Sequence, residues 1–523
     1  MFSKGALRDL FVAFSIVNLW LIRIWLKILP YNEGSNFFLP FSPLNTYLAA
    51  ILNVLLWGVL LWLLVRKTKR RPGLFAWVVL CVFLVTALLV AYGIGVAYIS
   101  VGRFVFLFGG QSAFWLSVGC WSFAAAAVFL LVRYRLWLAK YYAVLPILFS
   151  PYLLITLSES MQAVAKVEPA AHFRPHQTAA ASLRNPLKHK VVWVIFDETD
   201  YRLGFEKRPS FLSLPAFDSF KATALFAGKA YSPNDNTQTS LPALLTGLPL
   251  TKTVPVAAGK LDLVLMGTGA HRDFGQADTI FRQVKERGGS TALLGWYLPY
   301  SRVMKDVDLC HDYARFNVYT SESLLDVLFH QWREVLDMRF LPIKNTMLAE
   351  NQIGIVTSMR KDVANAIETN DPSFMFLHFS VPHSPNVYHR QSGELAFNRD
   401  KRLGYFDNLA LADRCLAELR KELEKKGLWD SSLVIVSSDH HWRTNTYDQK
   451  LDKQHVPFLA KFPGQRSALT YDGTFNTLLT KELILQVFDG KVNSPEDACR
   501  WLDRARQQKA APVVISAVQP DAD

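Results

Sequence analysis

The first third of the chain consists of long apolar runs separated by short polar connections. Three runs hold at least twenty positions each without a charged side chain: residues 46–65, 74–96 and 113–132. At 1.5 Å of rise per residue, each forms a helix long enough to cross roughly 30 Å of hydrocarbon. Residues 10–29 are also apolar apart from a few polar positions, and residues 142–157 form a shorter run with two prolines. The pattern predicts five transmembrane helices.

Lysine and arginine are distributed unevenly among the loops that join these runs. Residues 66–71 are almost entirely basic, and basic side chains also precede the first run and follow the fourth. The two remaining loops contain Arg103 as their single basic residue. Because basic loops stay on the cytoplasmic side, we expect the N-terminus inside and everything after about residue 157 outside. Four spans with a cytoplasmic domain are the alternative.

Two basic side chains, Arg23 and Lys27, lie within an apolar run. Arg23 belongs to the first predicted span. A long cationic side chain in a membrane helix either reaches toward the membrane surface or pairs with another group inside the bundle. We expect Arg23 to reach the surface, because it lies near the end of its run.

Beyond residue 189 the pattern changes to short β-branched or aromatic runs that alternate with amphipathic stretches. The predicted strands are residues 190–196, 290–296, 373–379, 432–437 and 456–462. The predicted helices are residues 278–287, 321–338, 404–426 and 476–487. Buried strands that alternate with helices are typical of an α/β domain with a mainly parallel sheet. We therefore predict a multi-span helical membrane domain followed by such a domain.

The predicted boundaries follow from these changes of pattern. The transmembrane domain covers residues 1–157 and a polar linker covers residues 158–189. An extracytoplasmic catalytic domain covers residues 190–510, and a C-terminal tail covers residues 511–523.

The composition agrees with a membrane protein. Hydrophobic residues make up 51% of the chain and charged residues 19%, which excludes a disordered chain and is unusual for a soluble enzyme. The net charge is +13, but part of it lies in short loops between apolar runs, so it does not indicate nucleic-acid binding. Five cysteines are too few for a disulfide scaffold.

Metal-binding side chains lie at the ends of several predicted strands. They are Asp197 and Glu198, His378 and His383, Asp439 with His440 and His441, and His455. In an α/β sheet the carboxyl ends of the strands meet at one edge, where ligands bind. Carboxylates and imidazoles suit Zn²⁺ or Mn²⁺. Any one of these residues could simply cap a helix or lie in the core, but the set predicts a metal site.

A cluster of hydroxyls precedes a short apolar helix. Thr237, Thr239 and Ser240 lie where this helix is expected to begin. A helix N-terminus attracts phosphate through its free N–H groups and its dipole. Ordinary capping explains one hydroxyl of the three, so we regard the cluster as a candidate phosphate or nucleophile site.

Between about residues 190 and 464 these motifs resemble, in order, the sulfatase-like branch of the alkaline phosphatase superfamily. Residues 215–218 (PAFD), 230–233 (AYSP) and 244–247 (LLTG) are similar to the nucleophile region of that branch. The resemblance places the nucleophile at Thr237, with Thr239 and Ser240 as rivals if the register is shifted. Sulfatases need a cysteine or serine there for conversion to formylglycine. A threonine cannot be converted, which disfavours sulfate-ester hydrolysis.

A threonine nucleophile, the aligned Glu198 and five N-terminal spans are similar to the inner-membrane phosphotransferases. These include lipid A phosphoethanolamine transferases and lipoteichoic acid synthases. The resemblance implies Glu198, Thr237, Asp439 and His440 as ligands of one divalent cation, Zn²⁺ ahead of Mn²⁺. It implies His383 and His455 as groups that bind the substrate phosphate. The further candidates are Asp197, His441 and Arg443.

The resemblance also implies a function and a location. The enzyme would reside in the bacterial inner membrane, with its catalytic domain on the periplasmic side. It would move a phosphoethanolamine or glycerol phosphate head group from a phospholipid, through a covalent phosphothreonine, to an envelope glycan or lipid. The alternatives are a membrane-tethered phosphoester hydrolase and a non-catalytic lipid-binding scaffold. The chain lacks the cysteine pairs of the lipid A enzymes, and the sequence does not indicate protein partners.

Overall fold

The computed structural model describes residues 4–29, 33–98, 122, 125–173, 187, 189–314, 319–336, 346–400, 402–444, 447 and 454–508. The chain divides into two compact units. The helical unit comprises Met1–Asn32, Leu39–Ala170 and Phe316–Asn345, and the sheet unit comprises Glu33–Phe38, Ala171–Arg315 and Thr346–Asp523. Each unit thus contains a segment from the other part of the sequence. The predicted limits at residues 157, 189 and 510 stay predictions.

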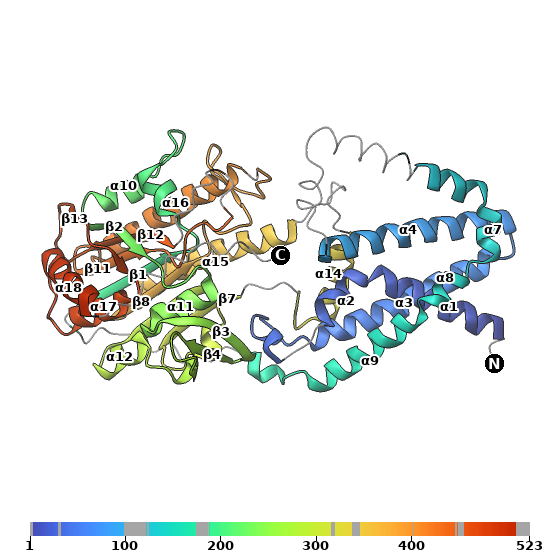
Figure 1. Cartoon of the computed structure of the whole chain (residues 1–523), viewed down its shortest axis with the longest axis horizontal. Coiled ribbons are helices and arrows are strands. Elements are labelled where there is room, and N and C mark those ends of the chain that lie inside the picture. Colours follow the sequence, from blue (N-terminus) through green and yellow to red (C-terminus); the bar gives the residue numbers. More distant parts are fainter. Residues whose placement is uncertain are drawn as a thin grey trace. The chain divides into compact units, whose positions relative to one another are not determined.

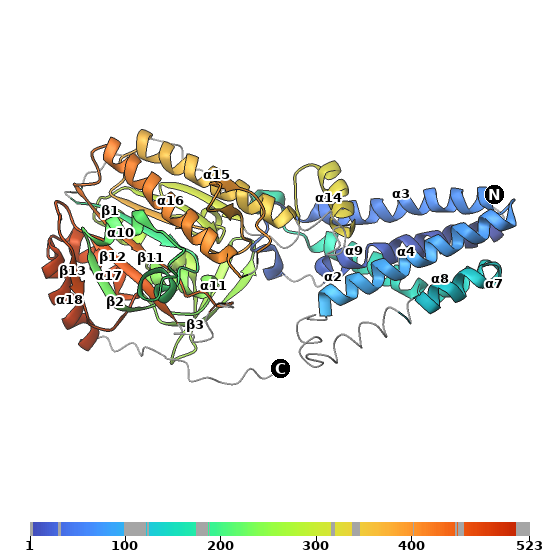
Figure 2. The same cartoon turned by 90° about the horizontal axis from the view of Figure 1, so that it is seen from above.

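The helical unit consists of apolar helices. They are α1 (Lys4–Trp20), α2 (Ile22–Ile28), α3 (Leu44–Thr68), α4 (Pro72–Tyr98), α7 (Arg135–Lys140), α8 (Val144–Leu148), α9 (Ser150–Lys166) and α14 (Leu324–Leu336). Figure 2 shows the long helices α3 and α4 of this unit. The 3₁₀ turn η2 (Ala170–Phe173) follows α9.

The prediction of five spans is not confirmed. Among the described residues, three helices are long and apolar enough to cross a membrane: Leu44–Thr68, Pro72–Ile94 and Pro146–Lys166. The predicted first span is broken, because α1 and α2 are bent by 65° at Leu21; counting the pair as one span gives four. The predicted span 113–132 lies largely outside the described residues. These helices agree with membrane association.

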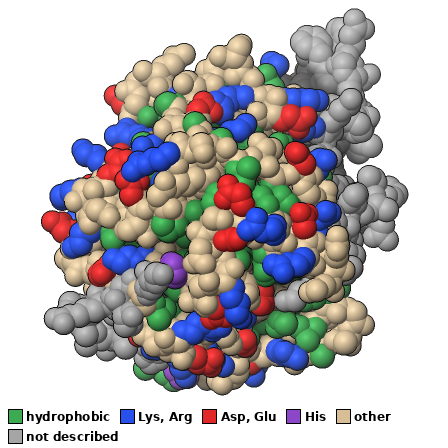
Figure 3. Space-filling view, turned by 90° about the vertical axis from the view of Figure 1, so that its left-hand side faces the viewer, with side chains coloured by type: hydrophobic (Ala, Val, Ile, Leu, Met, Phe, Trp, Pro, Cys, Tyr) green, Lys and Arg blue, Asp and Glu red, His purple; other side chains and the backbone are tan. Residues whose placement is uncertain are grey.

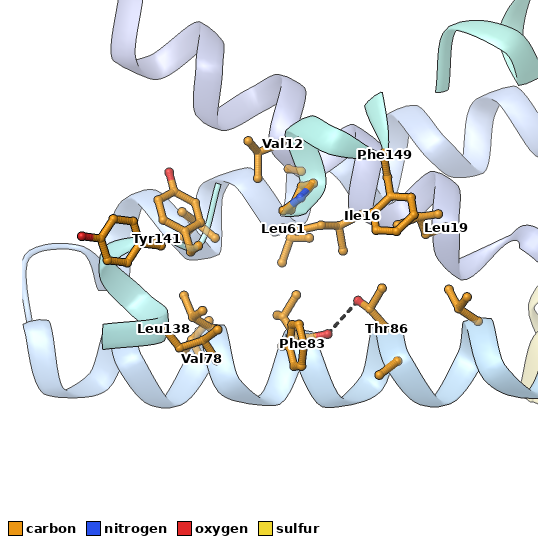
Figure 4. A pocket seen from close by; sticks show the side chains of 18 of the residues that line it. Val12, Ile16, Leu19, Leu61, Val78, Phe83, Thr86, Leu138, Tyr141 and Phe149 are labelled. Carbon is orange, nitrogen blue, oxygen red and sulfur yellow. Dashed lines mark hydrogen bonds between the residues drawn. The ribbon is translucent and has the colours of Figure 1, made fainter. Parts of the chain in front are cut away.

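A mostly apolar cavity of about 370 Å³ lies within the helical unit. Side chains from α1, α3 and α4 line it, among them Val12, Leu61 and Phe83 (Figure 4). Asp9 and Tyr142 also line it, and Lys69 donates hydrogen bonds to both of them. The lining is therefore suited to a hydrocarbon occupant beside one polar cluster.

The sheet unit is built on a mixed sheet of nine strands. They are β1 (Lys190–Phe196), β2 (Leu225–Tyr231), β6 (Thr291–Tyr297), β7 (Leu309–Ala314), β8 (Phe374–Phe379), β11 (Ser432–Ser437), β12 (His455–Lys461), β13 (Leu469–Tyr471) and β14 (Phe475–Asn476). The order is β13-β2-β12-β11-β1-β8-β6-β7, with β14 paired to β2. Only β12 pairs antiparallel to its neighbours in this described sheet. All five predicted strands are present, and the mainly parallel sheet is confirmed.

Helices cover both faces of the sheet (Figure 1). One core contains side chains of α10 (Pro215–Lys221), α15 (Thr346–Thr369) and α16 (Gly404–Lys425). The other contains side chains of α11 (Thr237–Thr246), α12 (Ile280–Glu286), α17 (Leu479–Phe488) and α18 (Pro495–Gln508). Along β1 the side chains alternate between them: Trp193 enters one core and Val194 the other. This period of two is what a strand buried on both faces requires.

Smaller elements complete the sheet unit. β3 (Leu250–Ala257), β4 (Lys260–Leu265) and β5 (His271–Asp273) form a separate antiparallel sheet, and β9 (Tyr388–His389) pairs with β10 (Glu394–Leu395). The short helical turns are η1 (Glu33–Asn36), η3 (Arg202–Glu206), η4 (Phe274–Gln276) and α13 (Tyr300–Val303). Phe37, just after η1, is fully buried in the core of the sheet unit, and its carbonyl accepts a 2.6 Å hydrogen bond from Arg302.

The antiparallel direction of β12 matters for the site. His455 is its first residue and pairs with Tyr231, the last residue of β2. The start of an antiparallel strand lies at the edge where its parallel neighbours end. A histidine before a strand thus reaches the same edge as carboxylates that follow other strands.

The surface of the described residues carries charges of both signs. Figure 3 shows Lys and Arg side chains interspersed with Asp and Glu on one face. Many of these charges are paired in the sheet unit, for example Arg287 with Asp489 at 2.8 Å and Arg466 with Asp430 at 2.8 Å. On the face shown, the excess positive charge does not form one continuous block.

We predict that Phe376→Ala destabilises the sheet unit strongly. Phe376 is fully buried, and its ring lies 5.2 Å from that of Trp193. The cavity left behind should cost about 3–5 kcal/mol, measured as a lower urea midpoint of the full chain in detergent by near-ultraviolet circular dichroism. Phe211→Ala is the control, because Phe211 is 42% exposed and should cost less than about 1 kcal/mol. Equal losses would contradict this packing.

Candidate metal and nucleophile site

Three buried metal-binding side chains meet where neighbouring strands end. Asp197 follows β1, His378 is the penultimate residue of β8, and Asp439 lies two residues after β11. Each offers one ligand atom, and these atoms all lie within 4.8 Å of one another. The three side chains converge because β8 and β11 are the two parallel neighbours of β1. All three residues are fully buried.

The hydroxyl of Thr237 lies against this group. Thr237 is the first residue of α11, and the Asn236 side chain caps the helix by accepting from the Thr239 N–H. Thr237 Oγ1 donates to Asp197 Oδ2 at 3.2 Å and lies 3.1 Å from His440 Nε2. The rival hydroxyl of Ser240 donates instead to the carbonyl of Asn234 at 3.0 Å. Thr237 is therefore placed at both the acidic group and the positive end of a helix dipole.

His440 presents a lone pair to the site. Its Nδ1 lies 2.8 Å from the carbonyl oxygen of His441, so this nitrogen carries the proton and donates. Nε2 then faces Thr237 Oγ1 and lies 3.3 Å from Asp439 Oδ2. Burial lowers the pKa of His440 to about 3, so the ring is neutral near pH 7. A histidine that donates one N–H to a backbone carbonyl has the usual arrangement of a metal ligand.

His378 has the same arrangement; the sequence placed it among the donors at the strand ends but assigned it no role in the site. Its Nδ1 lies 2.9 Å from the Trp296 carbonyl, which leaves Nε2 facing Asp197 Oδ2 at 3.3 Å. Burial lowers the pKa of His378 to about 4, so this nitrogen is unprotonated near pH 7. A lone pair facing a carboxylate oxygen calls for a cation between them. The available signal was one histidine in the otherwise apolar strand FMFLHF.

The carboxylates of the site are under electrostatic strain. Burial raises the pKa of Asp439. Burial, followed by repulsion from Asp197, raises the pKa of Glu198 to about 8. Asp439 Oδ1 accepts from the Glu198 N–H at 3.2 Å, and Oδ2 is buried without a hydrogen-bond partner among the described residues. Crowded buried carboxylates of this kind bind a proton or a metal ion.

Glu198, predicted as a ligand, is not one of the three side chains of this group. Its Oε1 lies 3.4 Å from Arg443 Nε, and its backbone has a φ of 64°. Such a left-handed conformation is unusual for a residue with a side chain and is stabilised here by Tyr405, whose hydroxyl donates to the Glu198 carbonyl at 2.8 Å. Asp197, predicted only as a further candidate, occupies the centre of the group instead.

The remaining predicted residues surround this centre. The backbone N–H of His383 donates to the Asp197 carbonyl at 3.1 Å, and the imidazole lies 5.0 Å from the Trp296 ring. His455 is stacked between Tyr201 and Tyr231 at 4.0 and 4.9 Å, and its Nε2 donates to the Gly228 carbonyl.

His441 and Arg443 follow the central Asp439. His441 Nδ1 accepts from the Gln454 N–H at 3.1 Å, which joins the loop after β11 to the start of β12. The Arg443 side chain is 39% exposed, so it is the accessible cation next to the buried acids.

The donor set suits a divalent cation. Asp197 and Asp439 supply oxygens and His378 supplies a neutral imidazole nitrogen, while Thr237 Oγ1 and His440 Nε2 lie next to them. Mixed carboxylate and imidazole ligands are typical of Zn²⁺ and Mn²⁺. The unsatisfied Asp439 Oδ2 is the clearest sign that the site is built for a cation.

Comparison with known proteins gives a family match and several distant likenesses. Residues 189–481, more than half of the chain, match the family model described as Sulfatase. The endo-4-O-sulfatase of Bacteroides thetaiotaomicron is 26% identical over 144 residues, which covers 22% of this chain and 28% of that protein.

Two similar solved structures have a lower sequence identity to this chain. The phosphonate monoester hydrolase of Agrobacterium radiobacter has a TM-score of 0.39 and 13% identity, over 58% of this chain and 73% of that one. A protein in the alkaline phosphatase superfamily from Vibrio parahaemolyticus has a TM-score of 0.37 and 15% identity, over 60% and 70%.

We predict that Asp439→Asn abolishes metal binding. The substitution removes the charge of a buried ligand and leaves the remaining donors too weak to hold a divalent ion. Metal content of the full chain, purified with Zn²⁺ or Mn²⁺ and analysed by plasma mass spectrometry, should fall from about one ion per chain to background. Asp312→Asn is the control, because Asp312 is a half-buried carboxylate that accepts from the Ser301 N–H outside the proposed site. Equal metal loss in both variants would contradict the assigned site.

We predict that metal affinity rises with pH up to about 8. In the metal-free protein the pKa of Glu198 is raised to about 8, so below that pH a proton is bound. A cation beside Asp197 and Asp439 repels this proton, and each displaced proton gives about a tenfold change in affinity per pH unit. Calorimetric titration on both sides of pH 8 tests this. Glu198→Gln should lower the number of protons released on metal binding by one, which makes the metal affinity less dependent on pH. A pH-independent metal affinity of the unaltered chain would contradict the prediction.

Proposed function

Since the chain belongs to the Sulfatase family and its sheet unit is an α/β domain with a mainly parallel sheet, we propose that it is a membrane-bound, metal-dependent phosphotransferase. It takes the phosphorylated head group of a phospholipid, phosphoethanolamine or glycerol phosphate, and transfers it through a covalent phosphothreonine. The acceptor is a hydroxyl of a cell-envelope glycan or lipid.

The position of the Thr237 hydroxyl carries this proposal. It lies 3.2 Å from Asp197 Oδ2 and 3.1 Å from His440 Nε2, at the N-terminus of α11. A threonine hydroxyl is a weak nucleophile at neutral pH and needs a base or a cation to react. The site offers Asp197 as the base, and Asp197, His378 and Asp439 are the side chains that would hold the cation.

The same residue favours phosphate over sulfate as the transferred group. Sulfatases of this branch act through formylglycine, which a threonine cannot form. The hydroxyl of Thr237 is suited to direct attack on phosphorus, and a cation held by the carboxylates and imidazoles next to it would offset the charge that grows on the phosphoryl oxygens in the transition state.

In the first step, Thr237 Oγ1 attacks the phosphorus of the donor. The bond between Oγ1 and phosphorus forms while the bond between phosphorus and the diacylglycerol oxygen breaks. Asp197, which already accepts the hydroxyl hydrogen bond, takes the proton, and the leaving oxygen is protonated from solvent. When bound, the divalent cation would lower the pKa of the hydroxyl and offset the charge of the phosphoryl oxygens.

In the second step, an acceptor hydroxyl attacks the phosphothreonine. The new phosphoester bond forms while the bond between phosphorus and Oγ1 breaks, Asp197 returns its proton to Oγ1, and the acceptor hydroxyl gives its proton to solvent. The predicted roles of His383 and His455 belong here: both lie at the edge of the sheet where the phosphoryl group would be held. His455 is fixed by its tyrosine neighbours, so its ring is preoriented.

The apolar helices support a lipid donor. Three described helices are long and apolar enough to span a membrane, and a phospholipid head group can be reached only at a bilayer surface. The distribution of basic loops supports a catalytic domain on the periplasmic side of the inner membrane. Membrane attachment would thus keep the Thr237 nucleophile at the surface where its lipid donor lies.

We predict that a covalent head-group adduct forms on Thr237. The full chain, loaded with Zn²⁺ or Mn²⁺, is incubated with phosphatidylethanolamine or phosphatidylglycerol and analysed by intact mass spectrometry and peptide mapping. The lipid that yields the adduct identifies the donor. Thr237→Ala should remove the adduct and lower turnover by about 10³-fold or more, whereas Thr237→Ser retains a hydroxyl and should keep part of both.

Thr239→Ala is the matched control, since it removes a neighbouring hydroxyl of the same cluster. An adduct that maps to position 239 or 240 would overturn the assignment of the nucleophile. Release of free head group without transfer to any added glycan or lipid would instead identify a hydrolase. A metal-loaded protein that forms no adduct and releases nothing would contradict the enzymatic proposal.

A further inference from the structure

Helix α14 belongs to the helical unit although its sequence lies within the α/β part of the chain. It follows β7 and precedes α15, which are both elements of the sheet unit. The segment Phe316–Asn345 nevertheless packs with the apolar N-terminal helices. The sequence predicted this helix, at residues 321–338, as an element of the α/β domain.

Polar side chains join α14 to the candidate span α3. The amide of Asn53 donates to Gln331 Oε1 at 2.9 Å, and Trp332 Nε1 donates back to Asn53 Oδ1 at 2.8 Å. Gln331 Nε2 donates to the Thr46 carbonyl at 2.8 Å. Asn53 and Gln331 are both buried. In hydrocarbon such groups must find partners within the protein, and α14 supplies them.

The same helix supplies a carboxylate to the broken first span. Glu334 is buried and forms ion pairs with Lys27 and with Arg23, whose Nε lies 3.8 Å from Glu334 Oε1. Arg23 also donates to the Glu334 carbonyl at 2.7 Å. Of the two roles considered for Arg23, the structure shows the ion pair. Arg23 pairs inside the bundle, because α14 brings an anion there that the local sequence does not contain.

Three edges of α14 have different characters. Val327, Gln331 and Glu334 face the neighbouring helices and are buried. Asp326 and Arg333 lie on a polar exposed edge. The third edge is apolar and exposed: Leu325 is 66% exposed, Phe329 70% and Leu336 46%. Positions 325, 329 and 336 share one side of a helix, because they repeat at four and seven residues.

We propose that α14 is an interfacial membrane helix whose apolar edge, Leu325, Phe329 and Leu336, lies against the acyl chains of the leaflet at the N-terminal end of α3. Its polar edge faces the head groups, and its buried edge, Val327, Gln331 and Glu334, docks on α3 and α2. Amphipathic helices with these three surroundings lie in the plane of the membrane boundary.

The occupant follows from the neighbouring surface. Beside the stripe that contacts α14, α3 exposes Leu52, Leu56 and Leu60 at 39, 50 and 46%, and α3 is long and apolar enough to span a bilayer. The docking polar contacts reach from Thr46 to Asn53 of α3, about 10 Å along the helix axis. A helix that packs on α3 between Thr46 and Asn53 contacts lipid through any apolar side that faces away from the protein.

The proposal has a consequence for the whole chain. It adds a second membrane attachment within the catalytic part of the sequence, independent of the N-terminal spans. It does not rest on the proposed phosphotransferase activity, since lipid contact and catalysis are measured separately.

Spin-label accessibility tests the proposal directly. The full chain, with its five cysteines replaced by alanine, is reconstituted in nanodiscs of phosphatidylethanolamine and phosphatidylglycerol. Single cysteines replace Leu325 or Phe329 on the apolar edge and Asp326 or Arg333 on the polar edge. The ratio of oxygen to nickel-chelate accessibility should be several-fold higher at 325 and 329 than at 326 and 333. Equal ratios, or nickel accessibility at 329 as high as at 333, would overturn it.

A second set of variants keeps the native cysteines. Phe329→Asp should lower the melting temperature of the protein in nanodiscs, whereas Phe329→Leu and Arg333→Asp should leave it nearly unchanged. Glu334→Gln should lower it as well, because two cations then lose their anion. An unchanged melting temperature for Phe329→Asp would show that this edge faces water and would overturn the proposal.

Discussion

The site depends on the crowding of buried negative charge at one edge of the sheet. Asp197 and Asp439 lie where β1 and β11 end, with Glu198 next to them, and none of the three is more than slightly exposed. The two imidazoles that face this group, His378 and His440, are neutral near pH 7 because burial lowers the pKa of each. Such an arrangement is stable only with a cation or with protons. The position of Thr237, the protonation of Glu198 and the use of this edge for chemistry all follow from it.

Much of the fold was predictable because it depends on local patterns. Strands such as residues 190–196 and 432–437 are continuous β-branched runs, and a strand buried on both faces shows this directly in the sequence. Asp439, His440 and Thr237 could be selected as candidates for a similar reason: Asp439 and His440 follow a predicted strand, and Thr237 lies where a helix is predicted to begin. The hydroxyl of Thr237 indeed lies against the buried acids.

The rest could not be predicted, because it depends on contacts between distant segments. His378 faces Asp197 across 181 positions of sequence, and only the pairing of β8 with β1 brings them together. The choice between Asp197 and Glu198 depends on one backbone conformation, the φ of 64° at Glu198, which turns its side chain toward Arg443. Likewise Arg23 pairs with Glu334, 311 positions away, and no periodicity of the apolar runs contains that information. In this chain the helices and strands follow from the local sequence, whereas the partners of charged groups depend on segments that are distant in the sequence.

The most direct test of this account is the position of the metal. Anomalous scattering at the zinc absorption edge, from crystals of the zinc-loaded full chain, locates the ion without assumptions about activity. The account predicts one peak at the carboxyl edge of the sheet, about 2.0–2.2 Å from oxygen and nitrogen donors, with Asp197, Asp439 and the Thr237 hydroxyl around it. A peak elsewhere in the molecule, or one from which Thr237 Oγ1 is beyond coordination distance, would contradict the claim that this edge activates the threonine.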